Sequence, residues 1–88
     1  MHHVLFYEYV PDIAERRAPH REAHLARIQT EKQAGRIVMA GALGEPPTGA
    51  AIVFEGVSPA EIESFAQEDP YVQAALVVDW RIEPWRLV

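Results

Sequence analysis

The segment Ser58-Pro59-Ala60-Glu61 sets the start of a helix in the second half of this chain. Serine at the N-cap and glutamate three residues later pair with backbone donors that a helix start leaves free, and proline suits the first helical position. An earlier helix is predicted over Pro19–Ala34, because Pro19 suits a first turn and Gly35 suits a left-handed cap. Outside these two helices, four segments remain whose secondary structure has to be assigned.

These four segments are patterned as strands, rich in β-branched and aromatic residues and bounded by Gly, Pro or Asp. They are His3–Tyr9, Arg36–Leu43, Ala50–Glu55 and Leu76–Val88. The turn-rich loop Gly44–Gly49 predicts that the middle two pair as an antiparallel hairpin. Residues 12–18 are expected to be irregular, and Asp69-Pro70 is expected to end the second helix and cap a short turn through Gln73.

The resulting order is strand, helix, strand, strand, helix, strand. It predicts an α+β fold of the ferredoxin-like βαββαβ type, in which a four-stranded antiparallel sheet carries both helices on one face. With 88 residues the chain has room for a single domain, spanning residues 1–88.

Both faces of the first two strands are apolar, and one layer of helices covers only one face. In the first strand, Val4 and Phe6 are expected on one face and Leu5, Tyr7 and Tyr9 on the other. In the second, Ile37, Met39 and Leu43 are expected opposite Val38, Ala40 and Ala42. In the last strand, one face carries Val78, Trp80 and Ile82 and the other carries charged residues. A second apolar face on so small a domain predicts a protein partner, most simply an identical sheet in a symmetric homodimer.

Composition excludes several classes of function. No cysteine is present, which removes disulfides, thiol nucleophiles and cysteine-bound metals. A net charge of −5 disfavours nucleic acid and anionic membranes as partners. No apolar run approaches the roughly 18 residues that span a bilayer. The first residues lack the pattern of a signal peptide, so a cytoplasmic protein is expected.

The histidines are the side chains that titrate near neutral pH. His20 and His24 share a helical face, but a metal site needs a third strong ligand, and we expect neither metal nor cofactor. His20 should be exposed in the first turn. His24 lies at the edge of the apolar stripe marked by Leu25, Ile28 and Lys32, where a histidine is either structural or catalytic.

Asp69 precedes a proline, which is the ordinary position of a helix cap. A capping carboxylate uses one oxygen on backbone donors and leaves the other free to accept from an imidazole. Paired with His24, it would fix the ring tautomer and raise its basicity, as a general base requires. Tyr7 and Tyr71 are either pocket phenols or packing residues. Arg16 and Arg17 either receive an anionic group or belong to a solvated loop.

Several stretches resemble YciI-like, YCII-related proteins of the dimeric α/β-barrel superfamily. They are Arg21-Glu22-Ala23-His24-Leu25, Gly35–Leu43, Glu68–Leu76 and Ile82-Glu83-Pro84-Trp85. The resemblance implies a ferredoxin-like protomer whose sheet packs on a second copy, with a His24–Asp69 dyad in a small pocket between sheet and helices. It also implies cofactor-independent proton transfer, or dehydrochlorinase-type chemistry, on small cyclic or aromatic compounds. Two positions depart from the family pattern: Ala75 replaces a usual glycine, and Ala50 a common serine.

The candidate site therefore has His24 and Asp69 as catalytic residues. Tyr7, Arg17, Gly41 and Tyr71 are its candidate substrate-binding residues. The leading hypothesis is a lyase or isomerase in which His24, oriented by Asp69, acts as general acid and base on a small cyclic or aromatic substrate. A second hypothesis is a noncatalytic, small-ligand-binding or accessory homodimer. A third, an oxygen-consuming monooxygenase of the dimeric-barrel kind, requires a quinol-like substrate.

Overall fold

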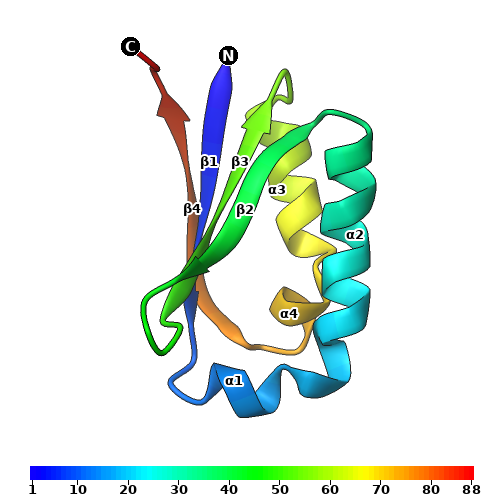
Figure 1. Cartoon of the computed structure of the whole chain (residues 1–88), viewed down its shortest axis with the longest axis vertical. Coiled ribbons are helices and arrows are strands. Elements are labelled where there is room, and N and C mark those ends of the chain that lie inside the picture. The colour runs from blue at the N-terminus through cyan, green and yellow to red at the C-terminus, as the bar shows by residue number, and fades with distance from the viewer.

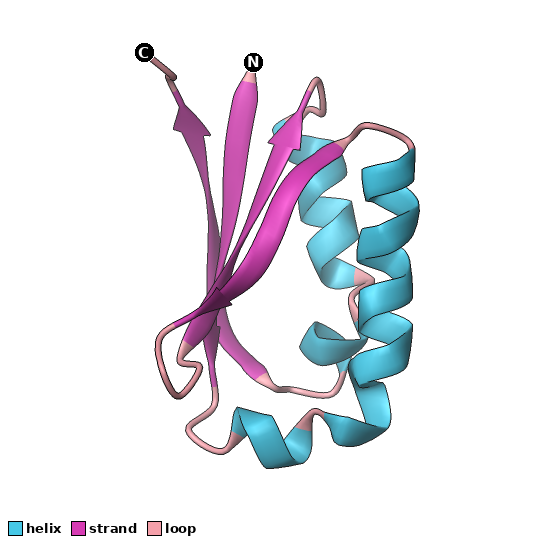
Figure 2. Ribbon diagram, viewed as in Figure 1, coloured by secondary structure: helices cyan, strands magenta, loops and turns pink.

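One antiparallel sheet forms a layer, and every helix lies on the same side of it (Figures 1 and 2). The computed structural model describes all residues, 1–88. In chain order the elements are β1 (His2–Tyr9), α1 (Ile13–Arg16), a 3₁₀ turn (Ala18–His20), α2 (Arg21–Gln33), β2 (Ile37–Leu43), β3 (Gly49–Glu55), α3 (Pro59–Gln67), α4 (Pro70–Gln73) and β4 (Val77–Trp85). The strand order is β2-β3-β1-β4. The predicted ferredoxin-like α+β fold is confirmed.

The capping box of α3 is formed as predicted. The Ser58 hydroxyl accepts from the Glu61 backbone N–H at 3.2 Å, and the Glu61 carboxylate accepts from the Ser58 N–H at 3.4 Å. Residues Ile62, Phe65 and Ala66 of this helix are buried. The helix therefore begins where its local sequence directs, and packing of one apolar stripe holds it against the sheet.

The first helical region differs from the prediction in two respects. The segment expected to be irregular contains α1, whose Ile13 is buried in the core. Pro19 lies in a 3₁₀ turn, where the His20 N–H bonds the Arg17 carbonyl, and α2 begins only at Arg21. The stripe was also placed wrongly: α2 buries His24 and Ile28, whereas Leu25 is 43% exposed.

Two strand irregularities change which side chains face the helices. In β2 the register shifts between Ile37 and Met39, so Ile37 pairs with Phe54 in the core while Met39 pairs with Val53 on the open face. The expectation that Ile37 and Met39 share a face was wrong. An extra residue in one strand reverses the alternation beyond it.

In β4 the shift falls at Val78. Tyr9 pairs with Val77, and Glu8 pairs with Asp79. Val77 therefore packs against the core together with Trp80 and Ile82, and Val78 is 58% exposed. The expectation that Val78 shares a face with Trp80 and Ile82 was wrong for the same reason as in β2.

The core lies between the sheet and the helices, built on the inward residues of β1 and β3. It includes Leu5, Tyr7, Tyr9, Ile52, Phe54, Ile62, Phe65 and Tyr71. The opposite face of the sheet carries no element of the chain, as Figure 2 shows. None of the helices is long and apolar enough to cross a membrane.

Candidate functional site

Three elements bring the polar groups of the site together on the helix side of the sheet. Tyr7 comes from β1, His24 from α2, and Asp69 and Tyr71 from the start of α4. All four residues are buried, and Asp69 is only 1% exposed. Gly49 of β3 contributes by having no side chain, because a Cβ there would collide with the Tyr7 carbonyl oxygen. Close approach of β3 to β1 thus helps to position Tyr7.

Asp69 is the centre of the hydrogen-bond network. Its Oδ1 accepts from the Tyr71 backbone N–H at 2.9 Å, which is the predicted cap, and its Oδ2 accepts from the Tyr7 hydroxyl at 2.8 Å. His24 Nδ1 lies 2.9 Å from Oδ1 and 3.1 Å from Oδ2. The predicted contact between His24 and Asp69 is present. Three donors from three elements satisfy a carboxylate that burial would otherwise penalise.

This network defines the state of the His24 ring. An ionised carboxylate only accepts hydrogen bonds, so the proton on the Asp69 side belongs to Nδ1, and in the neutral ring Nε2 carries the free lone pair. The ring stacks on Tyr71 with centroids 3.8 Å apart and planes 6° from parallel. Nε2 has no partner in the chain and is not sealed from solvent, since the buried unpaired polar atoms are His3 Nδ1 and Tyr71 Oη.

Tyr7 and Tyr9 stay protonated near neutral pH. Burial, and then the negative charge of Asp69, raise the pKa of Tyr7 far above its usual range. Burial, and then the proximity of Tyr71 and Asp69, also raise the pKa of Tyr9, while Arg17 and Arg21 act in the opposite direction. Tyr7 is therefore a fixed hydrogen-bond donor to Asp69, and it is not a source of protons near neutral pH.

A cavity of about 380 Å³ opens between α2 and strands β2 and β3, beside His24. This is the size of a small-molecule site. Its polar wall consists of Tyr9, Arg17, Arg21, His24, Gln29, Lys32 and Tyr71. Its apolar floor includes Ala40, Gly41, Ala42, Ala50 and Ile52. Ala50 contributes a methyl group to this floor.

Most of the candidate residues meet at this cavity. Arg17, Gly41, His24 and Tyr71 line it, whereas Tyr7 and Asp69 lie behind His24 and outside its lining. Arg16 instead pairs with Asp12, at 3.6 Å. No group of three or more His, Asp or Glu side chains is placed to hold a metal ion.

Four polar residues of the cavity were not among the candidate site residues of the sequence. They are Tyr9, Arg21, Gln29 and Lys32. On α2, Arg21 precedes His24 by three residues, Lys32 follows Ile28 by four, and Gln29 precedes Lys32 by three, so the helical period contains the signal. The sequence does not reveal it, because the stripe marked by Leu25, Ile28 and Lys32 also fits a contact with the core.

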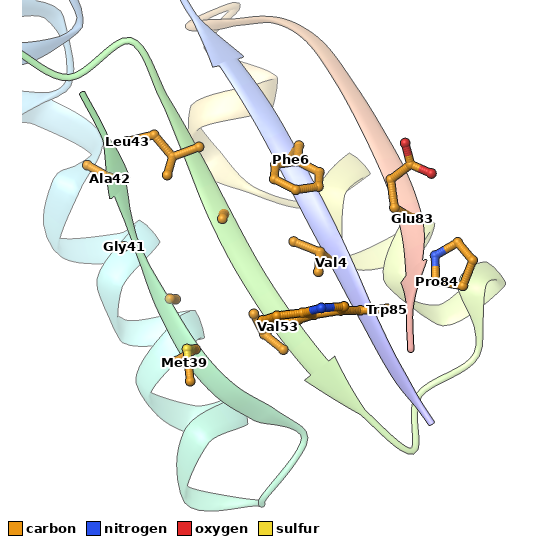
Figure 3. Close-up of a pocket in the computed structure, with 12 residues that line it drawn as sticks. Val4, Phe6, Met39, Gly41, Ala42, Leu43, Val53, Glu83, Pro84 and Trp85 are labelled. Carbon is orange, nitrogen blue, oxygen red and sulfur yellow. The ribbon is translucent and has the colours of Figure 1, made fainter. Parts of the chain in front are cut away.

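A second hollow, of about 540 Å³, lies on the open face of the sheet, away from His24. It is lined by the apolar residues Val4, Phe6, Met39, Leu43, Val53 and Trp85. Figure 3 shows the Trp85 indole lying across the strands toward Val53. Glu83 is the one ionisable side chain in its wall. We call these six residues the open-face patch. Its chemistry is that of a packing surface and differs from that of the His24 cavity.

The YCII-related domain family matches residues 1–86 of the chain. An uncharacterized protein of Haemophilus influenzae is 29% identical over 97 aligned positions, covering 100% of this chain and 99% of that protein. Protein YciI of Escherichia coli is 30% identical with the same coverage. A solved 5-chloro-2-hydroxyhydroquinone dehydrochlorinase of Burkholderia phenoliruptrix, in complex with 2,5-dihydroxybenzoquinone, has the same fold, with a TM-score of 0.81, 24% identity and coverage of 98% of this chain and 94% of that chain. The chain belongs to the YCII-related domain family.

Proposed function

We propose that this protein is an enzyme in which His24 moves protons on a small cyclic or aromatic substrate held in the cavity beside α2. The observation that carries the proposal is the arrangement of one ring: Nδ1 is bonded to buried Asp69, and Nε2 is free beside a cavity of ligand size. A solved protein of the same fold is named a dehydrochlorinase, which supports an enzymatic role. The reaction class is a lyase or isomerase.

The chemistry follows from the tautomer. Nε2 takes a proton from a C–H or O–H bond of the substrate, and the imidazolium formed keeps its Nδ1–H bond to Asp69, whose negative charge stabilises it. In an isomerisation, Nε2–H returns that proton to another atom of the substrate. In an elimination, the electron pair left behind expels the leaving group, and the proton then passes to solvent. Tyr7 and Tyr71 act as positioning residues, one through Asp69 and the other through the ring face.

A catalytic His24 predicts a specific pattern of losses. Turnover of small cyclic and aromatic compounds by the wild type should fall about 10²–10⁴-fold in His24→Gln, because one positioned acid–base group contributes that much. Ligand binding, measured on the same variant by calorimetry, should persist. His20→Gln is the matched control, since His20 does not line the cavity.

The opposite pattern would favour the second hypothesis. A wild type that binds ligands and turns none over, with binding indifferent to His24→Gln, indicates a noncatalytic binding protein. Oxygen uptake with a quinol-like substrate would instead point to a monooxygenase. A cytoplasmic location stays a prediction of the sequence.

We further propose that a second copy of the chain covers the open-face patch. Met39, Leu43 and Trp85 are 56%, 44% and 43% exposed although they share one sheet face. A patch of this kind is self-complementary about a two-fold axis and needs no second protein species.

A further inference from the structure

The walls of the His24 cavity are cationic in a chain that is acidic as a whole. The sequence has 13 Asp and Glu against eight Lys and Arg, yet the lining holds Arg17, Arg21 and Lys32 and no carboxylate. Asp69, the acid that bonds His24, is already occupied by three donors. A positive wall without its own counter-charge attracts an anion.

These three cations are also unpaired within the chain. The arginines that do form ion pairs are Arg16, Arg36 and Arg81, all outside this cavity. Arg27 bonds the Phe65 carbonyl at 2.9 Å. Free guanidinium groups beside a cavity are suited to bidentate contact with a planar oxygen acid.

An independent observation comes from the hydroxyl of Tyr71. This residue is 1% exposed and lines the cavity, and its Oη has no hydrogen-bond partner. A buried hydroxyl without a partner is costly, and because Oη itself is sealed from solvent, a ligand oxygen reaches it when the cavity side chains around it shift. The other buried unpaired atom, His3 Nδ1, belongs to a residue that lines no cavity. Tyr71 Oη is therefore the one buried, unpaired polar atom whose residue lines a cavity.

The groups gather at one end of the cavity. Arg17 and Arg21 are four residues apart, and Tyr9, which packs edge-on against Tyr71 at 6.1 Å, lies beside them. Lys32 is 11 residues beyond Arg21, or about 16 Å along the helix axis, at the other end. The favoured position for an anion is therefore the end of the cavity lined by Arg17 and Arg21, next to the stacked His24 and Tyr71 rings.

We infer that this cavity selects a small cyclic organic anion, whose carboxylate or phenolate oxygens lie between Arg17 and Arg21 and accept from Tyr71 Oη. This inference rests on the proposed function for the identity of the site and adds the charge of the substrate. Proton removal from a ring that already bears an anionic oxygen spreads further negative charge onto that oxygen. The two guanidinium groups stabilise that charge where it develops.

The test compares acids with their neutral amides on the intact protein. Benzoate against benzamide and salicylate against salicylamide are matched in shape, and calorimetry or ligand-observed NMR measures their binding without turnover. Each acid should bind at least about tenfold more tightly than its amide, and the difference should shrink with added salt. Arg17→Gln and Arg21→Gln should each weaken the acid about tenfold and leave the amide unchanged.

Arg16→Gln is the matched control, because Arg16 neighbours Arg17 in sequence but pairs with Asp12 outside the cavity. Tyr71→Phe should weaken the acid and keep the His24 stacking. Amides that bind as well as acids, variants without effect, or acids that fail to bind at millimolar concentration overturn the inference. If acids bind selectively but no compound is turned over, the proposed enzymatic function is contradicted and the anion-binding inference stands. If neutral compounds are turned over and acids are not preferred, the anion-binding inference is contradicted and the proposed enzymatic function stands.

Discussion

Asp69 and Tyr7 are 62 residues apart, and their contact joins the first strand to the last short helix. The pairing of Asp69 with His24 could be predicted, because a capping carboxylate has a spare oxygen and the family resemblance puts the two residues in one pocket. The role of Tyr7 as the third partner could not. It depends on the register of β1 against β3 and on the missing Cβ of Gly49, and no local pattern encodes either.

Replacing Tyr7 by phenylalanine tests this network through its pH dependence. Loss of a hydrogen bond to a buried carboxylate should lower the free energy of unfolding by about 1.5–3 kcal/mol near neutral pH. The pKa of Tyr7 is raised by folding, so the folded protein keeps a proton that the unfolded chain loses above about pH 10. The contribution of Tyr7 to stability is therefore fully present below about pH 10 and is lost as the pH rises above it. Urea unfolding at several alkaline pH values should give a shallower fall for Tyr7→Phe.

Tyr9→Phe is the control for the hydroxyl contact, because Tyr9 is also a buried β1 tyrosine and its hydroxyl bonds no group in the chain. Its loss at neutral pH should stay within about 0.5 kcal/mol. Equal losses in the two variants would mean that the Tyr7–Asp69 bond adds nothing to stability.

At the scale of elements, the helix caps could be predicted because their signals lie in a few consecutive residues. The strand irregularities could not be predicted. The capping box and the Asp69 cap act within three residues, so the sequence contains the whole interaction. The bulges at Val38 and Val78 leave no such trace, because both strands read as unbroken alternations. Helix α1 was missed because burial of one residue, Ile13, stabilises it rather than helix propensity.

The end of α4 carries a strained residue. Ala75 has a φ of +60°, the left-handed conformation that favours glycine. The Leu76 N–H bonds the Tyr71 carbonyl and the Ala75 N–H bonds the Val72 carbonyl, both at 3.0 Å, as in a Schellman motif. This backbone conformation explains why a glycine would suit the position, and this chain folds in spite of its alanine.

Ala75→Gly should accordingly stabilise the protein. Relief of the left-handed strain outweighs the extra entropy of an unfolded glycine by about 0.5–1 kcal/mol. Chemical denaturation measures the gain. Ala74→Gly is the paired control, since Ala74 has an ordinary φ of −85° and should lose stability by a similar amount. A loss in both variants would show that Ala75 is not strained.

On the scale of the whole molecule, the two faces of the sheet carry side chains of different chemistry. The face toward α2 and α4 holds the charged and hydrogen-bonding groups of the site, while the open face holds apolar side chains that no element of the chain covers (Figures 2 and 3). Alternation along a strand gives each face its own chemistry. The sequence predicted this division on β1, where the faces are separated by Val4 and Phe6 on one side and Leu5 and Tyr7 on the other.

The open face leads to a prediction about assembly. Sedimentation of the wild type should give twice the 9.9 kDa mass of one chain at micromolar concentration, and its melting temperature should rise with protein concentration. Met39→Glu should yield a monomer, because a carboxylate within the open-face patch loses its hydration without gaining a partner. Its fold should persist, since Met39 contributes nothing to the core between sheet and helices.

Val78→Glu separates burial of this face from a general effect of added charge. Val78 is as exposed as Met39, at 58% against 56%, but lies outside the open-face patch. The variant should remain a dimer with the melting temperature of the wild type. A wild type that sediments as a single chain at every concentration, or a Met39→Glu protein that still dimerises, would place the partner elsewhere. If His24 chemistry persists in the monomeric Met39→Glu, each protomer carries a complete site, in agreement with the contacts of Asp69, which all lie within one chain.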